Sequence, residues 1–279
     1  MILNYIKWNP NPEIVNIFGI SVRYYGLLFV TGLIICVYIL GWIFKKENIP
    51  SENLEKLTIY GMIDILAGAR LGHCLFYEPS YYLNHPIEMI LPIKFLNDGG
   101  IKFIGYQGLA SHGGALGLII ALIFYSRKTK HSIIDTLDLI AVVAALGGGF
   151  IRLANLMNSE IIGMPTSKPW GFIFERVDNI PRHPAQLYEA LTYFLIFGIT
   201  FTLYRTKRDN LKNGFFFGLT LILIFTARFF IEFIKERQVA FEENMKLDMG
   251  QLLSFPYIII GIGFILYGIN KTNKLKLSA

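Results

Sequence analysis

The stretch GGGFIRLANLMNSEIIG, residues 147–163, determines how the rest of this sequence is interpreted. It continues an apolar run and closes it with four polar residues: Arg152, Asn155, Asn158 and Glu160. An ionisable side chain next to membrane hydrocarbon is costly and is a functional hypothesis by default. We therefore predict a membrane helix that ends in a polar site, and we ask which other parts of the chain face that site.

The composition is typical of a membrane protein. Of the 279 residues, 53% are hydrophobic and 16% are charged, whereas soluble domains average about 25% charged residues. The formal net charge is +6, but the lysines lie in short loops between apolar runs, which favours membrane topology over nucleic-acid binding. Cys36 and Cys74 both lie in apolar runs, so we interpret them as buried free thiols.

Seven apolar runs are long enough to cross a bilayer, which takes about 20 helical residues. The predicted spans are residues 24–44, 57–77, 104–125, 133–157, 185–204, 214–234 and 249–269. Because nothing marks a domain boundary, we predict an all-α, polytopic membrane helical bundle with a single domain over residues 1–279. Small elements are expected in the outward-facing loops, of which residues 79–103 and 158–184 are long, and residues 1–20 are expected to form a short, ordered outer segment.

The basic residues predict the orientation of this bundle. Lys and Arg are concentrated in the short segments that follow the first, third, fifth and seventh predicted spans. The opposite segments are longer and mix their basic residues with acidic ones. By the positive-inside rule, the C-terminus is cytoplasmic, the N-terminus is outside, and the two long loops face outward.

Two pairs of polar residues share a helix face. Arg152 and Asn155 are three residues apart, and Arg228 and Glu232, in ARFFIEF, are four apart. The planar guanidinium of arginine suits a phosphate and stays charged when partly buried. The alternatives are structural: an interfacial pair of Arg152 with Glu160 that closes the bundle, and an ion pair of Arg228 and Glu232 between helices.

Three further spans carry isolated polar residues. His112, in ASHGGALG, can transfer a proton near neutral pH, or it can be a hydrogen-bonded core histidine. Arg70, in AGARLGH, needs a partner, for which Asp64 and a lipid phosphate are candidates. Asp138, in TLDLIA, is interpreted as structural, either capping a helix or pairing across helices.

The start of the fifth predicted span, RHPAQLYEA at residues 182–190, is also polar. Its His183, Gln186 and Glu189 either face the site or cap the helix. Tyr25 lies at the outer end of the first predicted span, where interfacial tyrosines are common.

Several chemistries have no support in the sequence. It contains no HExxH, Walker or GxGxxG motif and no GxSxG elbow, and its five histidines do not have the spacing of metal ligands. What remains is a membrane site with arginines, a histidine and carboxylates. Such a site suits an anionic lipid headgroup better than a metal or a nucleotide.

At this point the sequence resembles a known family, the bacterial prolipoprotein diacylglyceryl transferases. The motifs HGGALG, RLANLMNSEIIG, RHPAQLYE, RFFIEF and MGQLLS occur in the order and topological positions of that family, over about residues 20–256. Arg70 and YYGL at residues 24–27 match as well. One departure is Ile151, where the family usually has Gly directly before the arginine; we expect it to affect local helix packing but not the charged residues.

The resemblance implies a multi-pass enzyme of the bacterial inner (cytoplasmic) membrane. Such enzymes transfer the diacylglyceryl group of phosphatidylglycerol to the lipobox cysteine thiol of a prolipoprotein signal peptide, forming a thioether and releasing glycerol phosphate. The implied partners are these two substrates and membrane lipid, with no nucleic acid, metal or cofactor. The family's functional positions correspond here to Tyr25, Arg70, His112, Arg152, Asn155, Glu160, Arg228 and Glu232.

The chemistry suggests a role for each of these groups. We expect Arg152 to hold the lipid phosphate with help from Arg228, because negative charge develops on the leaving phosphate. His112 is the candidate base for the thiol, and Tyr25 is a weaker one. We expect Glu232 to orient Arg228, and Glu160 to orient Arg152 or to contact the glycerol headgroup.

His183 is a further predicted substrate contact. The alternative function is a transporter or flippase for an anionic lipid, which would also need intramembrane arginines. Transporters of this kind often contain internal repeats, and we find none in seven spans.

Overall fold

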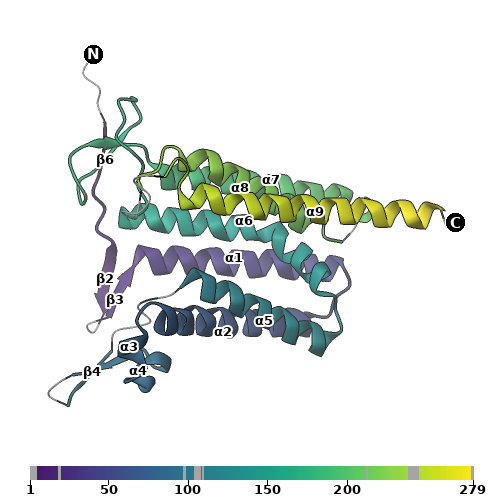
Figure 1. The fold of residues 1–279 in the computed structure, drawn as a ribbon, viewed down its shortest axis with the longest axis horizontal. Helices are drawn as coiled ribbons and strands as arrows, with labels where there is room; N and C mark the ends of the chain where they lie inside the picture. Colours follow the sequence, from purple (N-terminus) through teal and green to yellow (C-terminus); the bar gives the residue numbers. More distant parts are fainter. Residues whose placement is uncertain are drawn as a thin grey trace. The chain divides into compact units, whose positions relative to one another are not determined.

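The computed structural model describes residues 5–17, 20–96, 99–103, 108, 110–211, 213–237 and 245–277 (Figure 1). Its long helices are α1 (Tyr24–Lys46), α2 (Ser51–Phe76), α5 (Ser111–Thr129), α6 (Ile133–Asn158), α7 (Ala185–Lys207), α8 (Phe215–Glu232) and α9 (Met249–Leu277). The chain forms two compact units, one of residues 1–40 with 137–279 and the other of residues 41–136. Each unit is described by itself below.

Six helices in the described part of the chain are long and apolar enough to cross a membrane: α1, α2, α6, α7 with its continuation to Asn210, α8, and α9 as far as Tyr267. They correspond to six of the seven predicted spans. The seventh, predicted at residues 104–125, falls on α5, which is not among these six. Residues 104–107 and 109 of that prediction lie outside the described residues. Within α5, polar His112 and the basic pair Arg127 and Lys128 confine the apolar stretch to the middle of the helix.

Short strands and turns supplement the long helices, so the all-α prediction needs a correction outside the apolar spans. The strands are β1 (Ile6–Trp8), β2 (Glu13–Ile17), β3 (Ile20–Arg23), β4 (Ile93–Phe95), β5 (Ile101–Phe103), β6 (Phe172–Phe174) and β7 (Pro181–Arg182). The short helices are α3 (Pro79–Tyr82), α4 (Pro86–Ile90) and η1 (Arg208–Asn210). Sequences such as IKF and FIF are rich in aromatic and β-branched residues, which favours strands, but they are too short to stand out against the apolar spans.

One small sheet fixes the end of α6. Strand β6 pairs in parallel with β1 and antiparallel with β7. The buried rings of Phe172 and Phe174 pack against Leu156 of α6 and Ile162, with Trp8 covering this core. The indole N–H of Trp8 donates a hydrogen bond of 2.9 Å to the carbonyl oxygen of Leu156. The loops that follow α6 therefore pack on a core of their own, close to the polar residues of the helix.

Within the first unit, α6, α7, α8 and α9 lie alongside one another (Figure 1). Ala145 of α6 and Tyr193 and Ile196 of α7 form a buried core, onto which side chains of α8 pack. The backbones of α8 and α9 touch at glycines: a Cβ added to Gly218 would lie 2.6 Å from the carbonyl oxygen of Gly261. Such close contact is how apolar helices associate tightly without a hydrophobic driving force between them.

Within the second unit, α2 and α5 also pack closely through glycines at their crossing. A Cβ added to Gly72 would lie 2.9 Å from the Cα of Gly113, and Gly68 and Gly117 also contact backbone across this crossing. Gly113 and Gly117 are small residues four positions apart, a spacing that is typical of closely packed membrane helices.

Asp138 caps α8, in agreement with the predicted structural role. Its side chain is fully buried, and its carboxylate accepts hydrogen bonds of 2.8 Å from the main-chain N–H groups of Gly214 and Phe217. A nitrogen of the Arg208 guanidinium lies 3.7 Å from one carboxylate oxygen. These contacts join α6 to the start of α8.

The Asp138→Ala variant should be clearly less stable than the parent protein. It loses a helix cap and leaves one buried and one part-buried N–H group without the Asp138 acceptor, for which we expect a loss of about 2–4 kcal/mol in the free energy of unfolding. Reversible unfolding in detergent micelles measures the difference. The matched control is Asp209→Ala, an exposed acid nearby, which should change stability by no more than about 0.5 kcal/mol. Equal effects of the two substitutions would contradict the capping role.

Candidate functional site

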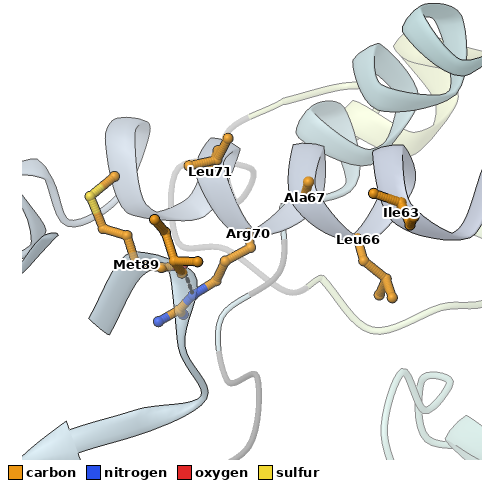
Figure 2. A pocket seen from close by; sticks show the side chains of 7 residues that line it. Ile63, Leu66, Ala67, Arg70, Leu71 and Met89 are labelled. Atoms are coloured by element: carbon orange, nitrogen blue, oxygen red, sulfur yellow. Dashed lines mark hydrogen bonds between the residues drawn. The ribbon is translucent and has the colours of Figure 1, made fainter. Parts of the chain in front are cut away.

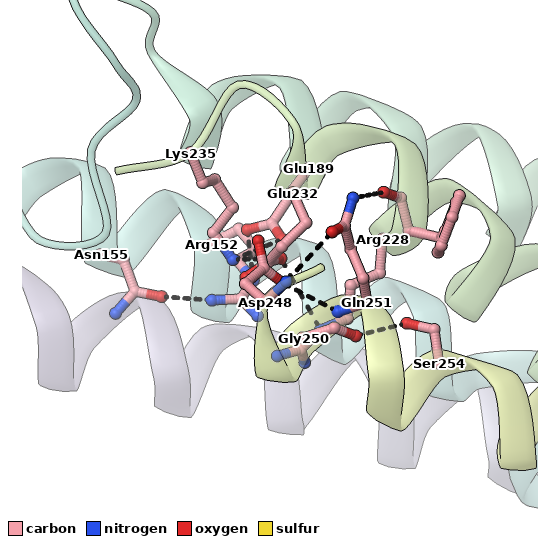
Figure 3. A network of polar contacts seen from close by, with 11 residues as sticks. Arg152, Asn155, Glu189, Arg228, Glu232, Lys235, Asp248, Gly250, Gln251 and Ser254 are labelled. Atoms are coloured by element: carbon pink, nitrogen blue, oxygen red, sulfur yellow. Dashed lines mark hydrogen bonds and ion pairs between the residues drawn. The ribbon is translucent and has the colours of Figure 1, made fainter. Parts of the chain in front are cut away.

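Polar side chains from three long helices converge at one end of the first unit (Figure 3). Arg152 comes from α6, Glu189 from α7, Arg228 and Glu232 from α8, and Lys235 from the segment that follows α8. We call these five residues the ionic cluster. Two pairs that were predicted separately, on the fourth and sixth spans, therefore belong to one site.

Glu189 is the buried centre of the ionic cluster. Its side chain has no exposed area. One carboxylate oxygen lies 2.9 Å from Nε of Arg152, and the other lies 3.5 Å from Nζ of Lys235. A buried carboxylate is costly unless cations compensate its charge, so these two contacts explain how Glu189 is tolerated here.

Glu232 forms the second half of the cluster. Its Oε2 lies 2.9 Å from Nζ of Lys235 and 4.0 Å from Nε of Arg228. The start of α9 is held beside it: Gln251 and Asp248 exchange side-chain and main-chain hydrogen bonds of 2.9 and 3.2 Å, which is the reciprocal pattern of a capping box. The amide of Gln251 also donates to the carbonyl oxygen of Phe229 in α8, at 3.4 Å.

The ionic cluster has a positive charge in excess, because it contains three cations and two carboxylates. Arg228 is the most accessible cation, with 32% of its side chain exposed, and its Nε has no hydrogen-bond acceptor among the described residues. The side chain of Arg152 is 15% exposed. A partly exposed guanidinium in a cluster with positive charge in excess is suited to bind an anion such as a phosphate.

A chain of amides extends from the cluster to Glu160. Nη1 of Arg152 donates to Oδ1 of Asn155 at 3.4 Å, and Nδ2 of Asn155 donates to Oε2 of Glu160 at 3.1 Å. Asn158 donates to the other oxygen of Glu160 at 2.9 Å. The carboxylate that pairs directly with Arg152 is therefore Glu189, and the alternative of a direct Arg152–Glu160 pair is not observed.

Glu160 lies between two residues with a left-handed backbone. Ser159 has φ of 57° and Ile161 has φ of 56°, which is uncommon for a residue other than glycine and especially for a β-branched one. The amide of Gln186 holds this turn by donating to the carbonyl oxygen of Glu160. Gln186 therefore faces the site rather than capping its own helix. Strained backbone of this kind occurs at functional sites, where the surrounding structure over-determines it.

Ile151 does not interrupt α6. The helix runs through this residue to Asn158, and the side chain of Ile151 is half-buried. The departure from the family pattern thus leaves Arg152 on a regular helix.

The RHP segment that precedes α7 has a different role from the cluster. Arg182 is nearly buried and donates to Asp178 at 2.6 Å and to Glu236 at 3.0 Å; this guanidinium holds the pKa of Asp178 below its usual range. Nδ1 of His183 lies 3.2 Å from the hydroxyl of Tyr188. Burial, and secondarily the charge of Lys168, lowers the pKa of His183.

Tyr25, at the start of α1, belongs to the same unit as the ionic cluster. Its side chain is half-buried.

Arg70 and His112 belong to the second unit, residues 41–136. Arg70 donates to the carbonyl oxygens of Glu88 at 2.6 Å and Met89 at 3.2 Å, so main-chain groups of α4 rather than the side chain of Asp64 receive these bonds. It lines an apolar cavity of about 310 Å³ (Figure 2). The other residues of the lining are Ile63, Leu66, Ala67, Leu71, Met89 and Ile90. His112 is the second residue of α5, and its side chain is exposed.

Sequence reasoning missed one residue of the cluster and left another undecided. Lys235 had a signal, because it follows Arg228 by seven residues and Glu232 by three, which continues the same helical face. Glu189 was one of three polar residues in its motif, and only the structure identifies it as the partner of Arg152. Among the side chains that the structure describes, no three His, Cys, Asp or Glu residues gather as metal ligands.

The sequence is similar to known proteins over nearly its whole length. A family model described as prolipoprotein diacylglyceryl transferase matches residues 12–267. A phosphatidylglycerol–prolipoprotein diacylglyceryl transferase of Bacteroides fragilis is 57% identical over 270 residues, covering 96% of this chain and 98% of the relative. Proteins with the same description from Chloroherpeton thalassium and Tolumonas auensis are 41% and 43% identical, covering 99% and 91% of this chain and 98% and 94% of the relatives, respectively.

Proposed function

The chain belongs to the prolipoprotein diacylglyceryl transferase family, and from that premise we propose that the ionic cluster binds the headgroup phosphate of its lipid donor. The protein is a multi-pass membrane enzyme. It transfers the diacylglyceryl group of phosphatidylglycerol to prolipoproteins, which is the first step of lipoprotein maturation. The acceptor atom is the thiol of the lipobox cysteine in the signal peptide.

The reaction exchanges one bond for another at a single carbon. The thiol sulfur attacks the glyceryl carbon that carries the phosphate ester, so that an S–C bond forms as the C–O bond breaks. The bonding electrons leave with the oxygen, and glycerol phosphate departs with an added negative charge. Cations aimed at that phosphate therefore stabilise the transition state more than the ground state.

Arg152 and Arg228 are the groups that meet this requirement. The observation that carries the assignment is the positive charge in excess on the ionic cluster, together with the partial exposure of the Arg228 side chain. Glu232 orients Arg228. Asn155 and Glu160, which the amide chain connects to Arg152, contact the glycerol part of the headgroup. His183 and Arg70 remain proposed substrate contacts, and the apolar cavity beside Arg70 suits an acyl chain.

Replacing the proposed base tests the proton step. The unperturbed thiol pKa of about 8.5 leaves little thiolate at neutral pH, and we assign the proton to His112, with Tyr25 as the weaker candidate. His112→Gln should lower kcat by roughly 10²- to 10⁴-fold at pH 7, as expected for loss of a general base. Activity should partly return at higher pH, where the thiol ionises by itself.

A pH–rate profile of His112→Gln beside Tyr25→Phe measures this effect. The matched control is His131→Gln, because His131 lies just beyond the opposite end of α5 and should leave the profile unchanged. Wild-type rates for His112→Gln at every pH would exclude His112 as the base.

The topology is part of the proposal. We place the enzyme in the inner (cytoplasmic) membrane of a bacterial cell, with α5 as a seventh span, the N-terminus outside and the C-terminus in the cytoplasm. The glycine crossing of α2 and α5 supports a membrane-embedded α5. A reporter fused after residue 279 that is active only in the cytoplasm should be active; an inactive but expressed fusion would contradict this orientation.

The activity itself is tested with purified protein in detergent. Phosphatidylglycerol and a peptide containing a lipobox cysteine are added, and the diacylglyceryl thioether is sought by mass spectrometry. A transporter or flippase would return both substrates chemically unchanged. Folded protein that yields no thioether would overturn the proposed function.

A further inference from the structure

We propose that Lys235 is a positioning residue, which keeps Arg152 and Arg228 available to the substrate by neutralising the two carboxylates between them. The proposal rests on the phosphate-binding role proposed above for the two arginines. It assigns a part in the reaction to a residue that does not itself touch the lipid.

The contacts of Lys235 distinguish it from the other cations (Figure 3). Its Nζ lies 2.9 Å from Glu232 and 3.5 Å from Glu189. Arg152 pairs with Glu189 and Arg228 pairs with Glu232, so within the described part of the cluster only Lys235 contacts both carboxylates. It therefore compensates charge for both arginine–carboxylate pairs.

Lys235 is more deeply buried than the two arginines, so its role differs from theirs. Its side chain is 5% exposed, against 15% for Arg152 and 32% for Arg228. A cation this deeply buried cannot present its ammonium to a bound phosphate. Any effect of Lys235 on catalysis must act through the carboxylates, and through them on the two guanidinium groups.

The main chain fixes Lys235 independently of its side chain. Residues 234–236 run beside residues 162–164: Met164 N–H donates to the carbonyl of Ile234 at 2.8 Å, and Glu236 N–H donates to the carbonyl of Ile162 at 3.1 Å. Lys235 and Gly163 form an antiparallel bridge between these hydrogen bonds. A substitution of the Lys235 side chain therefore leaves the backbone path intact and removes mainly the charge.

The consequence of losing that charge follows from charge balance. Without Lys235, two arginines face two carboxylates, and the positive charge in excess is gone. Carboxylates in a poorly solvated site attract the fork of a guanidinium into bidentate pairs. Arg152 and Arg228 would then donate their hydrogen bonds to Glu189 and Glu232 rather than to the lipid phosphate.

Lys235→Met is the direct test, because methionine is similar in length and carries no charge. Each arginine then has fewer charged hydrogen bonds to offer, and we expect kcat/KM to fall roughly 10- to 100-fold, with KM for phosphatidylglycerol raised. Lys235→Arg retains the charge and should stay within about threefold of the parent enzyme. Steady-state kinetics over a range of phosphatidylglycerol concentrations separates KM from kcat.

A double variant tests the charge-balance argument specifically. Lys235→Met combined with Glu232→Gln again has one positive charge in excess, because two arginines then face only Glu189. We expect this double variant to be more active than Lys235→Met alone. If its loss of activity is instead the product of the two single losses, Lys235 does not act through the carboxylates and the proposal is overturned.

The control and the outcomes keep this test separate from the proposed function. Lys7→Met removes an exposed lysine of β1, whose side chain is 76% accessible, and should leave activity unchanged. A parent enzyme that makes no thioether would overturn the proposed function. An active parent enzyme with Lys235→Met at the same kcat and KM would overturn this inference alone. Should Lys235→Met fail to fold, the double variant and Lys235→Arg, compared with Glu232→Gln, decide the question.

Discussion

Replacing Arg152 by Gln should abolish diacylglyceryl transfer, with kcat/KM lower by about 10³-fold or more. Loss of a single neutral donor at a developing oxyanion already costs about 10²- to 10³-fold, and here the lost group also carries a full charge opposite a departing phosphate. The fold should survive, because Glu189 keeps Lys235 as a counter-ion at 3.5 Å. Thioether formation by mass spectrometry and thermal unfolding in detergent measure the two effects separately.

Two further arginine variants sharpen this prediction. Arg152→Lys retains a charge but not the planar fork, so it should recover only part of the activity. Arg176→Gln removes an exposed arginine in the loop after α6, whose contact is with the carbonyl of Asn158 at 3.5 Å, and it should be nearly as active as the parent enzyme. Near-normal transfer by a folded Arg152→Gln protein would show that Arg152 does not bind the phosphate.

The part of the site that could be predicted from the sequence was predicted from the spacing of polar residues along each helix. The intervals between Arg152 and Asn155, and between Arg228 and Glu232, put each pair on one helix face, and the structure brings both pairs to one end of the first unit. The apolar runs likewise predicted six helices that the structure contains, with ends shifted by a few residues. These features are local, and local features can be read from periodicity.

The choice of ion-pair partners could not be predicted in this way. Arg152 pairs with Glu189, 37 positions further along the chain, and not with the nearer Glu160. Arg70 donates to main-chain carbonyls of α4. Because every residue has a carbonyl group, residue types in the sequence cannot indicate which carbonyl accepts these hydrogen bonds. The short strands depend on pairing between segments as distant as β1 and β6. Contacts of this kind are decided by tertiary packing, which no spacing rule describes.

Glu189→Leu should cause the largest loss of stability of any single substitution in the ionic cluster. Arg152 and Lys235 would remain in a buried site without the carboxylate that they share, and breaking a buried ion pair by removing one partner costs about 3–5 kcal/mol. Activity should be lost as well, since Arg152 loses the contact of 2.9 Å that orients its guanidinium. Unfolding in detergent micelles, followed beside thioether formation, measures both.

Comparison with milder changes shows whether charge or shape is responsible. Glu189→Gln keeps the size and one acceptor oxygen, so it should lose less stability than Glu189→Leu, yet it should still impair transfer because the charge that holds Arg152 is gone. Glu175→Gln changes an exposed glutamate whose ion pair with Lys7 is long, at 3.9 Å, and such surface pairs contribute at most about 1 kcal/mol. If Glu189→Leu were as stable as Glu175→Gln, the buried carboxylate would not be the partner that holds these cations, and the ionic cluster would have to be explained without it.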